Sequence, residues 1–115
     1  MTLQEYYEMI PALHAERISQ VFDAILEYDP HIKIEFYITA QNCFPLIYHK
    51  TYEAFGMASR KGYISLYIAS FKLQKTALLC MGETKDITGC IHISDKHPMP
   101  DLRPVIDQLL KDTHF

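Results

Sequence analysis

One ten-residue stretch, Lys61 to Ser70, constrains the fold more than any other part of the sequence. Its apolar side chains occupy alternate positions, at Ile64, Leu66 and Ile68. Side chains of a β-strand point alternately to opposite faces, so this pattern predicts a strand with one purely apolar face. The opposite face carries Lys61, Tyr63, Ser65 and Tyr67. We therefore expect a central sheet strand with a core on one side and a polar-rimmed surface or groove on the other.

The totals are those of one ordinary domain of 115 residues with a formal net charge of −3. A chain of this size buries about two-thirds of its unfolded surface, and the charge lacks the basic footprint of nucleic-acid binders. No apolar run approaches the roughly 20 residues that span a bilayer, and the N-terminus lacks a signal-peptide pattern. Three widely spaced cysteines fit reduced thiols. We predict a single cytoplasmic domain, residues 1–115, that binds neither nucleic acid nor membrane.

Helical signals stand at both ends of the chain. Thr2 and Glu5 form a capping-box pattern, which predicts a short helix that stops before Pro11. A longer helix runs to about Tyr28 and ends at Asp29-Pro30. Its expected apolar stripe is Leu13, Ile18, Val21, Phe22, Ile25 and Leu26. Helical spacing recurs over 71–81, and a last helix is expected after Asp101 as N-cap, with Pro104 in its first turn.

Further extended segments are expected over 32–39, 43–48, 52–59 and 88–94. Pro45 argues for an edge or a bend, Gly56 for a bulge, and residues 60–62 for a hairpin turn. Strands framed by helices predict an α+β fold, an antiparallel sheet of about five strands with N-terminal helices and a C-terminal helix packed on one face. If the last strand shares this sheet, Cys90 and His92 join the polar face.

That polar face is the first candidate site, with Lys61, Tyr63, Ser65, Tyr67, Cys90 and His92 as ligand-binding residues. A lysine charge and hydroxyl groups suit a small anionic or polar ligand. The alternative is a plain sheet surface whose tyrosines cover apolar neighbours. Cys90 with His92 is also the minimum for a metal pair or for a nucleophile and base, but an inert buried cysteine is the simpler interpretation.

Two further clusters contain metal-ligand residue types. Glu16, Asp23 and Glu27 place carboxylates on one helix face, which suits loose iron binding or simply a solvated surface. His92 and His97, with Asp95 between them, suit a transition metal or a solvated loop. The chain has no phosphate-binding glycine loop, His-Glu-x-x-His, nucleophile elbow or Cys-x-x-Cys. Ordinary enzyme classes therefore have no positive indication, although a minor activity on the polar face stays open.

The segment Lys61-Gly62-Tyr63-Ile64-Ser65-Leu66-Tyr67 resembles the central motif of the YdhG-like family, small bacterial domains of unknown function. Some members are described as frataxin-like intracellular iron chaperones. Further matching segments are Ile10-Pro11, Glu16-Arg17, Ala54-Phe55-Gly56, Gly89-Cys90-Ile91 and Pro100-Asp101-Leu102. The resemblance implies a frataxin-like layout and a non-enzymatic binding domain that handles iron through weak acidic sites. A small-ligand pocket and a homodimerising interaction module on the tyrosine-rich face are the alternatives.

Three positions depart from the family pattern. Leu46 and Tyr48 stand where the family carries threonine and an acid, and Thr88 stands where it carries lysine. If the family groove uses that carboxylate or that lysine, this protein has lost part of the function or changed its ligand.

Overall fold

The computed structural model describes residues 1–49, 53–68, 71–81 and 91–113. Its helices are α1 (Leu3–Glu8), α2 (Ala12–Tyr28), α3 (Phe71–Cys80) and α4 (Arg103–Thr113). Its strands are β1 (Glu35–Ile38), β2 (Cys43–His49), β3 (Glu53–Arg60), β4 (Tyr63–Ile68) and β5 (Ile91–Ser94). Within the described residues these strands form one sheet in the order β1-β2-β3-β4-β5, with every neighbouring pair antiparallel. The predicted α+β fold is confirmed.

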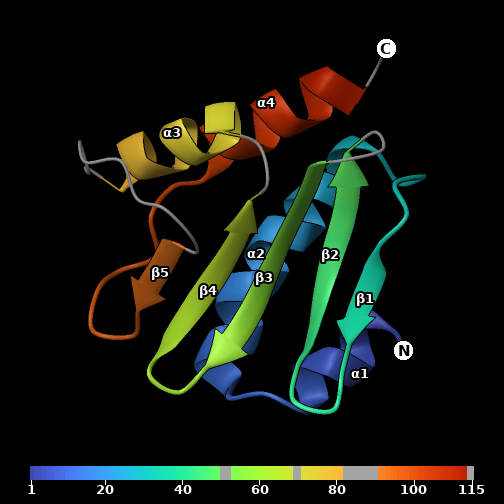
Figure 1. Cartoon of the computed structure of the whole chain (residues 1–115), viewed down its shortest axis with the longest axis vertical. Helices are drawn as coiled ribbons and strands as arrows, with labels where there is room; N and C mark the ends of the chain where they lie inside the picture. Colours follow the sequence, from blue (N-terminus) through green and yellow to red (C-terminus); the bar gives the residue numbers. More distant parts are fainter. Residues whose placement is uncertain (50–52, 69–70, 82–90, 114–115) are drawn as a thin grey trace.

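The sheet has a covered face and an open face (Figure 1). In this view α1 and α2 lie behind the sheet, and α3 and α4 run along its upper end. The main core combines apolar side chains of α2, α3 and α4 with those of strands β2 to β5. The near face of strands β1 to β4 carries none of the described helices. The side packed against the helices is the covered face, and the opposite side is the open face.

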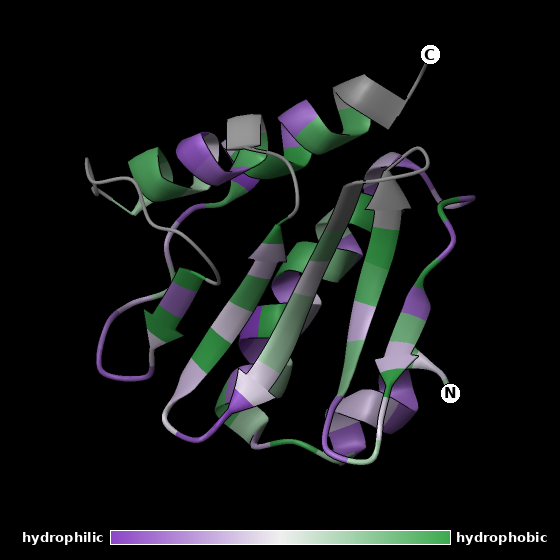
Figure 2. Cartoon of the chain, in the orientation of Figure 1, coloured by the Kyte–Doolittle hydropathy of each residue, from purple (hydrophilic) through white to green (hydrophobic). Residues whose placement is uncertain are grey.

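Strand β4 separates the two faces in the way its sequence predicts. Ile64, Leu66 and Ile68 are buried in the main core, whereas Tyr63 and Tyr67 are half-buried. Leu66 pairs with Met57 of β3 and Ile91 of β5, so the apolar surface continues across three strands. Figure 2 shows the alternation as green and pale bands along β4. The predicted anchoring of the sheet by its even-numbered side chains is therefore confirmed.

Helix α2 buries a stripe that differs from the predicted one. Leu13 was expected in the core, but it is 40% exposed, while the adjacent His14 is 1% exposed. One position corresponds to about 100° around a helix, so burying His14 turns Leu13 outward. The buried side chains are His14, Arg17, Ile18, Val21, Phe22 and Ile25. The stripe therefore begins with two polar residues, and each of them has hydrogen-bond partners.

The predicted capping box of the first helix is present. The Glu5 N–H donates to the Thr2 hydroxyl at 3.1 Å, and the Thr2 N–H donates to the Glu5 carboxylate at 3.0 Å. At the other end of the chain, the Arg103 N–H donates to the Asp101 carboxylate at 3.1 Å. Asp101 was predicted as the N-cap of the last helix, but it lies one residue before that position, because the Leu102 carbonyl accepts the first helical hydrogen bond, from the Ile106 N–H. Hydrogen bonding from the Arg103 side chain lowers the pKa of Asp101. Both carboxylates satisfy backbone donors that a helix start leaves without partners.

Several strand predictions need correction. Pro45 was expected at an edge or a bend, but β2 lies between β1 and β3, and Pro45 pairs with Phe36. Proline is tolerated there because the pairing of β2 with β3 begins one residue later, at Leu46. Gly56 forms no bulge, since it pairs with one residue on each side. The first strand begins at Glu35 rather than at residue 32, and residues 52 and 88–90 lie outside the described part of the chain.

Candidate functional site

The open face gathers most of the predicted ligand-binding residues. Tyr63, Ser65 and Tyr67 share this side of β4, and the pairing of Ser65 with His92 places the histidine beside them. Lys61 is exposed in the turn that joins β3 to β4. The neighbouring Gly62 has a φ of 84°, a left-handed conformation that glycine adopts without steric cost. Cys90 lies outside the described residues.

Arg60, which the sequence interpretation did not include, closes the centre of this face. Its Nη2 donates a hydrogen bond to the Tyr67 hydroxyl at 2.7 Å. Arg60 pairs with Tyr63 and Tyr67 pairs with Gly56, so the pair formed by Ala58 and Ser65 lies between them. The bridge passes over that pair, which explains why Ser65 is 2% exposed. A ligand on the open face therefore meets the guanidinium and the tyrosine rings rather than the predicted Ser65 hydroxyl.

Aromatic rings continue the open face toward the β1 edge. Phe44 stacks on Tyr67 with ring centroids 4.5 Å apart and 8° between the planes. Tyr37 extends the row, with its centroid 5.3 Å from that of Phe44. Gly56 makes room for the stack, because a Cβ atom there would lie 3.1 Å from Cε2 of Phe44. Arg60, Tyr67, Phe44 and Tyr37 therefore form one aromatic row that starts at a cation.

His92 marks the opposite end of the open face. Its ring packs on that of Tyr63, with centroids 4.3 Å apart and 30° between the planes. The same histidine lines a hollow of about 360 Å³ beside β5. The lining residues are Met81, His92, Ile93, Ser94, His97, Pro98 and Pro100. A second hollow of about 360 Å³ lies between α2 and the start of α4. Neither hollow is lined by Lys61 or Tyr67.

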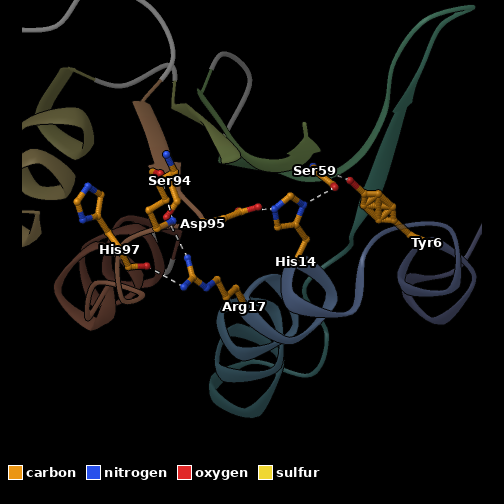
Figure 3. A network of polar contacts seen from close by, with 8 residues as sticks. Tyr6, His14, Arg17, Ser59, Ser94, Asp95 and His97 are labelled. Carbon is orange, nitrogen blue, oxygen red and sulfur yellow. Dashed lines mark hydrogen bonds and ion pairs between the residues drawn. The ribbon is translucent and has the colours of Figure 1, made fainter. Parts of the chain in front are cut away.

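A buried polar network crosses the covered side of the molecule (Figure 3). His14 bonds the Ser59 hydroxyl through Nδ1 and the Asp95 carboxylate through Nε2, both at 2.6 Å. The Ser59 N–H donates to the Tyr6 hydroxyl at 3.1 Å. Burial raises the pKa of Tyr6, so its hydroxyl keeps its proton. The network thus joins α1, α2, β3 and the segment after β5.

Arg17 lies about one helical turn after His14 on α2. Its side chain binds backbone carbonyls at the end of β5 and in the segment after β5. Its Nη1 donates to the Ser94 carbonyl at 3.3 Å, and its Nη2 donates to the His97 carbonyl at 2.7 Å. These bonds connect positions 77 and 80 residues apart in the sequence. Because Ser94 and His97 line the hollow beside β5, the guanidinium holds part of the wall of that hollow in place.

Ser59, His14 and Asp95 are the residue types of an acyl-transfer triad, joined in the same order. In a neutral ring, Nε2–H donates to the carboxylate and Nδ1 accepts from the hydroxyl, a tautomer that follows from the two partners. Catalysis would also require donors for an oxyanion and room for a substrate. The Ser59 N–H already donates to Tyr6, and neither hollow described above includes Ser59. We therefore assign the network a positioning role.

The predicted acidic site on α2 is exposed but not compact. Glu16, Asp23 and Glu27 all face solvent. Glu16 and Glu27 stand eleven positions apart, about 16 Å along a helix axis, so the three carboxylates do not converge on one ion. Among the described residues, no three side chains of His, Cys, Asp or Glu are grouped to hold a metal. Iron binding at this face stays a prediction.

Sequence reasoning missed the residues of the network for a physical reason. His14 contacts partners 45 and 81 residues away, and no local pattern encodes such distances. One signal was present: His14 and Arg17 precede Ile18, Val21 and Ile25 at helical spacing, on the extension of the apolar stripe. Asp95, expected to be a metal ligand or a solvated loop residue, instead belongs to the network.

Comparisons with family models, curated proteins and solved structures give no match to this chain. The resemblance to the YdhG-like family therefore stays a prediction. No helix in the described part of the chain combines the length and apolar character required to cross a membrane.

Proposed function

We propose that the protein is a non-enzymatic binding domain that takes a small planar anion on the open face of its sheet. The observation that carries this proposal is the position of Arg60. Its guanidinium lies beside the Tyr67 ring, 5.9 Å from the centroid, at the end of a stacked aromatic row. A cation next to flat rings offers charge pairing and stacking to one ligand at once.

The charges of the described residues favour this position for an anion. Among the described residues, Lys33 and Arg103 form ion pairs with carboxylates, and Arg60 belongs to neither of these pairs. A guanidinium has five N–H donors, and the bond to Tyr67 occupies one. The remaining donors suit a carboxylate or a phosphate, while half-buried Tyr63 and Tyr67 supply surfaces for a ring.

The test uses benzoate and indole-3-acetate as planar probes and cyclohexanecarboxylate as a non-planar control of equal charge. In a titration followed by two-dimensional NMR, the planar probes shift the amide signals of β3 and β4 near Arg60 and Tyr67. Arg60→Gln abolishes these shifts, whereas Lys75→Gln, which removes an exposed charge on α3, leaves them unchanged. Equal shifts in the Arg60→Gln variant, or equal binding of the non-planar acid, would reject the proposal.

A homodimer is the second candidate, and the exposed edge strand β1 favours it. Tyr37 and Ile38 are 48% and 61% exposed on β1, an edge strand of the described sheet. Edge strands with apolar side chains present unpaired backbone groups to a second chain. Sedimentation equilibrium distinguishes the two candidates, because Ile38→Lys shifts a dimer toward monomer and leaves binding of benzoate at Arg60 intact.

A further inference from the structure

The hollow between α2 and the start of α4 has a volume of about 360 Å³. Its floor is apolar, because the residues that line it include Val21, Leu102 and Ile106 of the main core. The exposed side chain of Gln20 stands at its rim. Ligand pockets in proteins enclose about 300–1,000 Å³, so this hollow lies at the lower end of that range. Its size suits a single protruding side chain better than a large ligand.

Exposed carboxylates of α2 lie next to this hollow. Glu16 and Asp23 stand four and three positions from Gln20. Glu27 stands three positions from Ala24, which also lines the hollow. Residues three or four positions apart are neighbours on a helix surface. All three carboxylates are exposed, so they favour a cation beside the apolar floor.

The Arg103 guanidinium also lines the hollow, but it is paired with a carboxylate of its own. Its Nη2 donates to Asp101 at 2.6 Å, and its Nε donates to both carboxylate oxygens of the same residue at 3.0 Å. Asp107, four positions after Arg103, adds an exposed carboxylate on α4. The surface around the hollow therefore has an excess of negative charge among the described residues.

One surface of the same chain has the complementary chemistry. Leu79 of α3 is 71% exposed, more than any other large apolar side chain in the described part of the chain. Lys75 is also exposed and stands four positions earlier, so the two side chains are neighbours on α3. They form the Lys75–Leu79 surface. Because Leu79 is exposed, it does not fill the hollow of its own chain, and a contact between the two surfaces joins two chains.

We propose that the hollow between α2 and α4 binds the Lys75–Leu79 surface of a second copy of this chain. Leu79 enters the apolar hollow, and the Lys75 ammonium lies among the exposed carboxylates of α2. Two different surfaces meet in this contact, so repetition of it builds a ring or an open chain of molecules. The contact is separate from the anion site at Arg60 and from the edge strand β1.

The parent protein for the test carries Ile38→Lys, which excludes the β1 edge from the measurement. In sedimentation equilibrium its average mass rises with concentration and falls when salt screens the charges. Leu79→Gln removes the apolar anchor, and Gln20→Lys places a positive charge at the rim of the hollow. Each change weakens the association by at least about ten-fold, the effect of a hot-spot residue. Met9→Gln and Gln41→Lys, which make matching changes at other exposed positions, leave it unchanged.

A mixture of the two site variants separates a docking contact from a general loss of stability. Each variant alone has the mass of one chain, but the Leu79→Gln variant keeps an intact hollow and the Gln20→Lys variant keeps the intact surface on α3. The mixture therefore forms a complex with one chain of each. With the Leu79→Gln variant labelled for NMR, the amide signals of Val21, Ala24 and Ile106 shift on addition of the other variant.

Far-UV circular dichroism verifies that each variant is folded. A parent protein that keeps the mass of one chain up to about 1 mM would overturn the proposal. A mixture no heavier than either variant alone would overturn it as well, because the two intact surfaces would then have met without binding.

Discussion

Ser59 and Arg60 are consecutive residues of β3 that point to opposite sides of the sheet, and they differ in how many hydrogen-bond partners the protein gives them. Ser59 faces the covered side, where both its hydroxyl and its N–H have partners that are themselves held by other elements. Arg60 faces the open side, where a single tyrosine hydroxyl accepts from its guanidinium among the described residues. Buried polar groups require partners, whereas the guanidinium of half-buried Arg60 can also be hydrated. The covered side therefore contributes to stability, and the open side retains donors for a ligand.

The largest expected effect is that of His14→Ala. The change leaves the Asp95 carboxylate and the Ser59 hydroxyl without their partner and opens a cavity beside α2, so we expect a loss of about 3 kcal/mol. Arg60→Ala on the open side removes one hydrogen bond and costs about 1 kcal/mol. Urea denaturation measures both values, with exposed His31→Ala as the control. Equal losses for His14→Ala and Arg60→Ala would remove the distinction between the two sides.

Gly56→Ala tests whether packing on the open side also has a strict requirement. The added methyl group meets the Phe44 ring, the Leu46 Cβ and the Pro45 carbonyl, each at 3.1 Å. Overpacking of this kind costs about 2 kcal/mol. In a Phe44→Ala background the same change should cost less, because the ring has gone and the two effects are coupled. Identical costs in the two backgrounds would show that the backbone, not the ring, is the obstacle.

Tyr7→Phe tests the rule that buried polar groups require partners, and it has the smallest expected effect on stability. The Tyr7 hydroxyl is buried without a hydrogen-bond partner among the described atoms, and burial, with a smaller effect of the Asp23 charge, raises its pKa to about 12. Removal of such a group is expected to stabilise the protein by about 1 kcal/mol.

The same pKa predicts a dependence on alkaline pH. The folded pKa lies above the ordinary tyrosine pKa of 10.0, so the unfolded chain loses this proton first and the free energy of unfolding falls as the pH rises from 10 toward 12. Tyr7→Phe should flatten that decline in thermal melts across this range, while Tyr37→Phe, at an exposed ring, should not. A parent protein with constant stability from pH 10 to 12 would contradict the assignment.

Local patterns predicted the parts of the structure that depend on neighbours in the sequence. The alternation around Leu66 defines the two faces of β4, and Thr2 with Glu5 defines the start of α1. The failures concern positions whose environment is set by distant elements. Pro45 is tolerated inside the sheet because of where the pairing with β3 begins, and Ser65 is buried because Arg60 reaches across it. The position of His14 on the apolar stripe of α2 indicated its burial, but its partners could not be predicted, because they meet it only when α2 docks on the sheet.

The two hydrogen bonds from Arg17 to backbone carbonyls affect how easily strand β5 opens to solvent. Strand β5 is four residues long and lies at the edge of the described sheet, so its backbone ladder is short. Short edge elements usually exchange their amide hydrogens at a low opening free energy. Here the hydrogen bonds of Arg17 to Ser94 and His97 connect β5 to α2. The amides of β5 should therefore stay protected from hydrogen exchange until α2 itself detaches from the sheet. The two ends of the chain would then open as one cooperative unit.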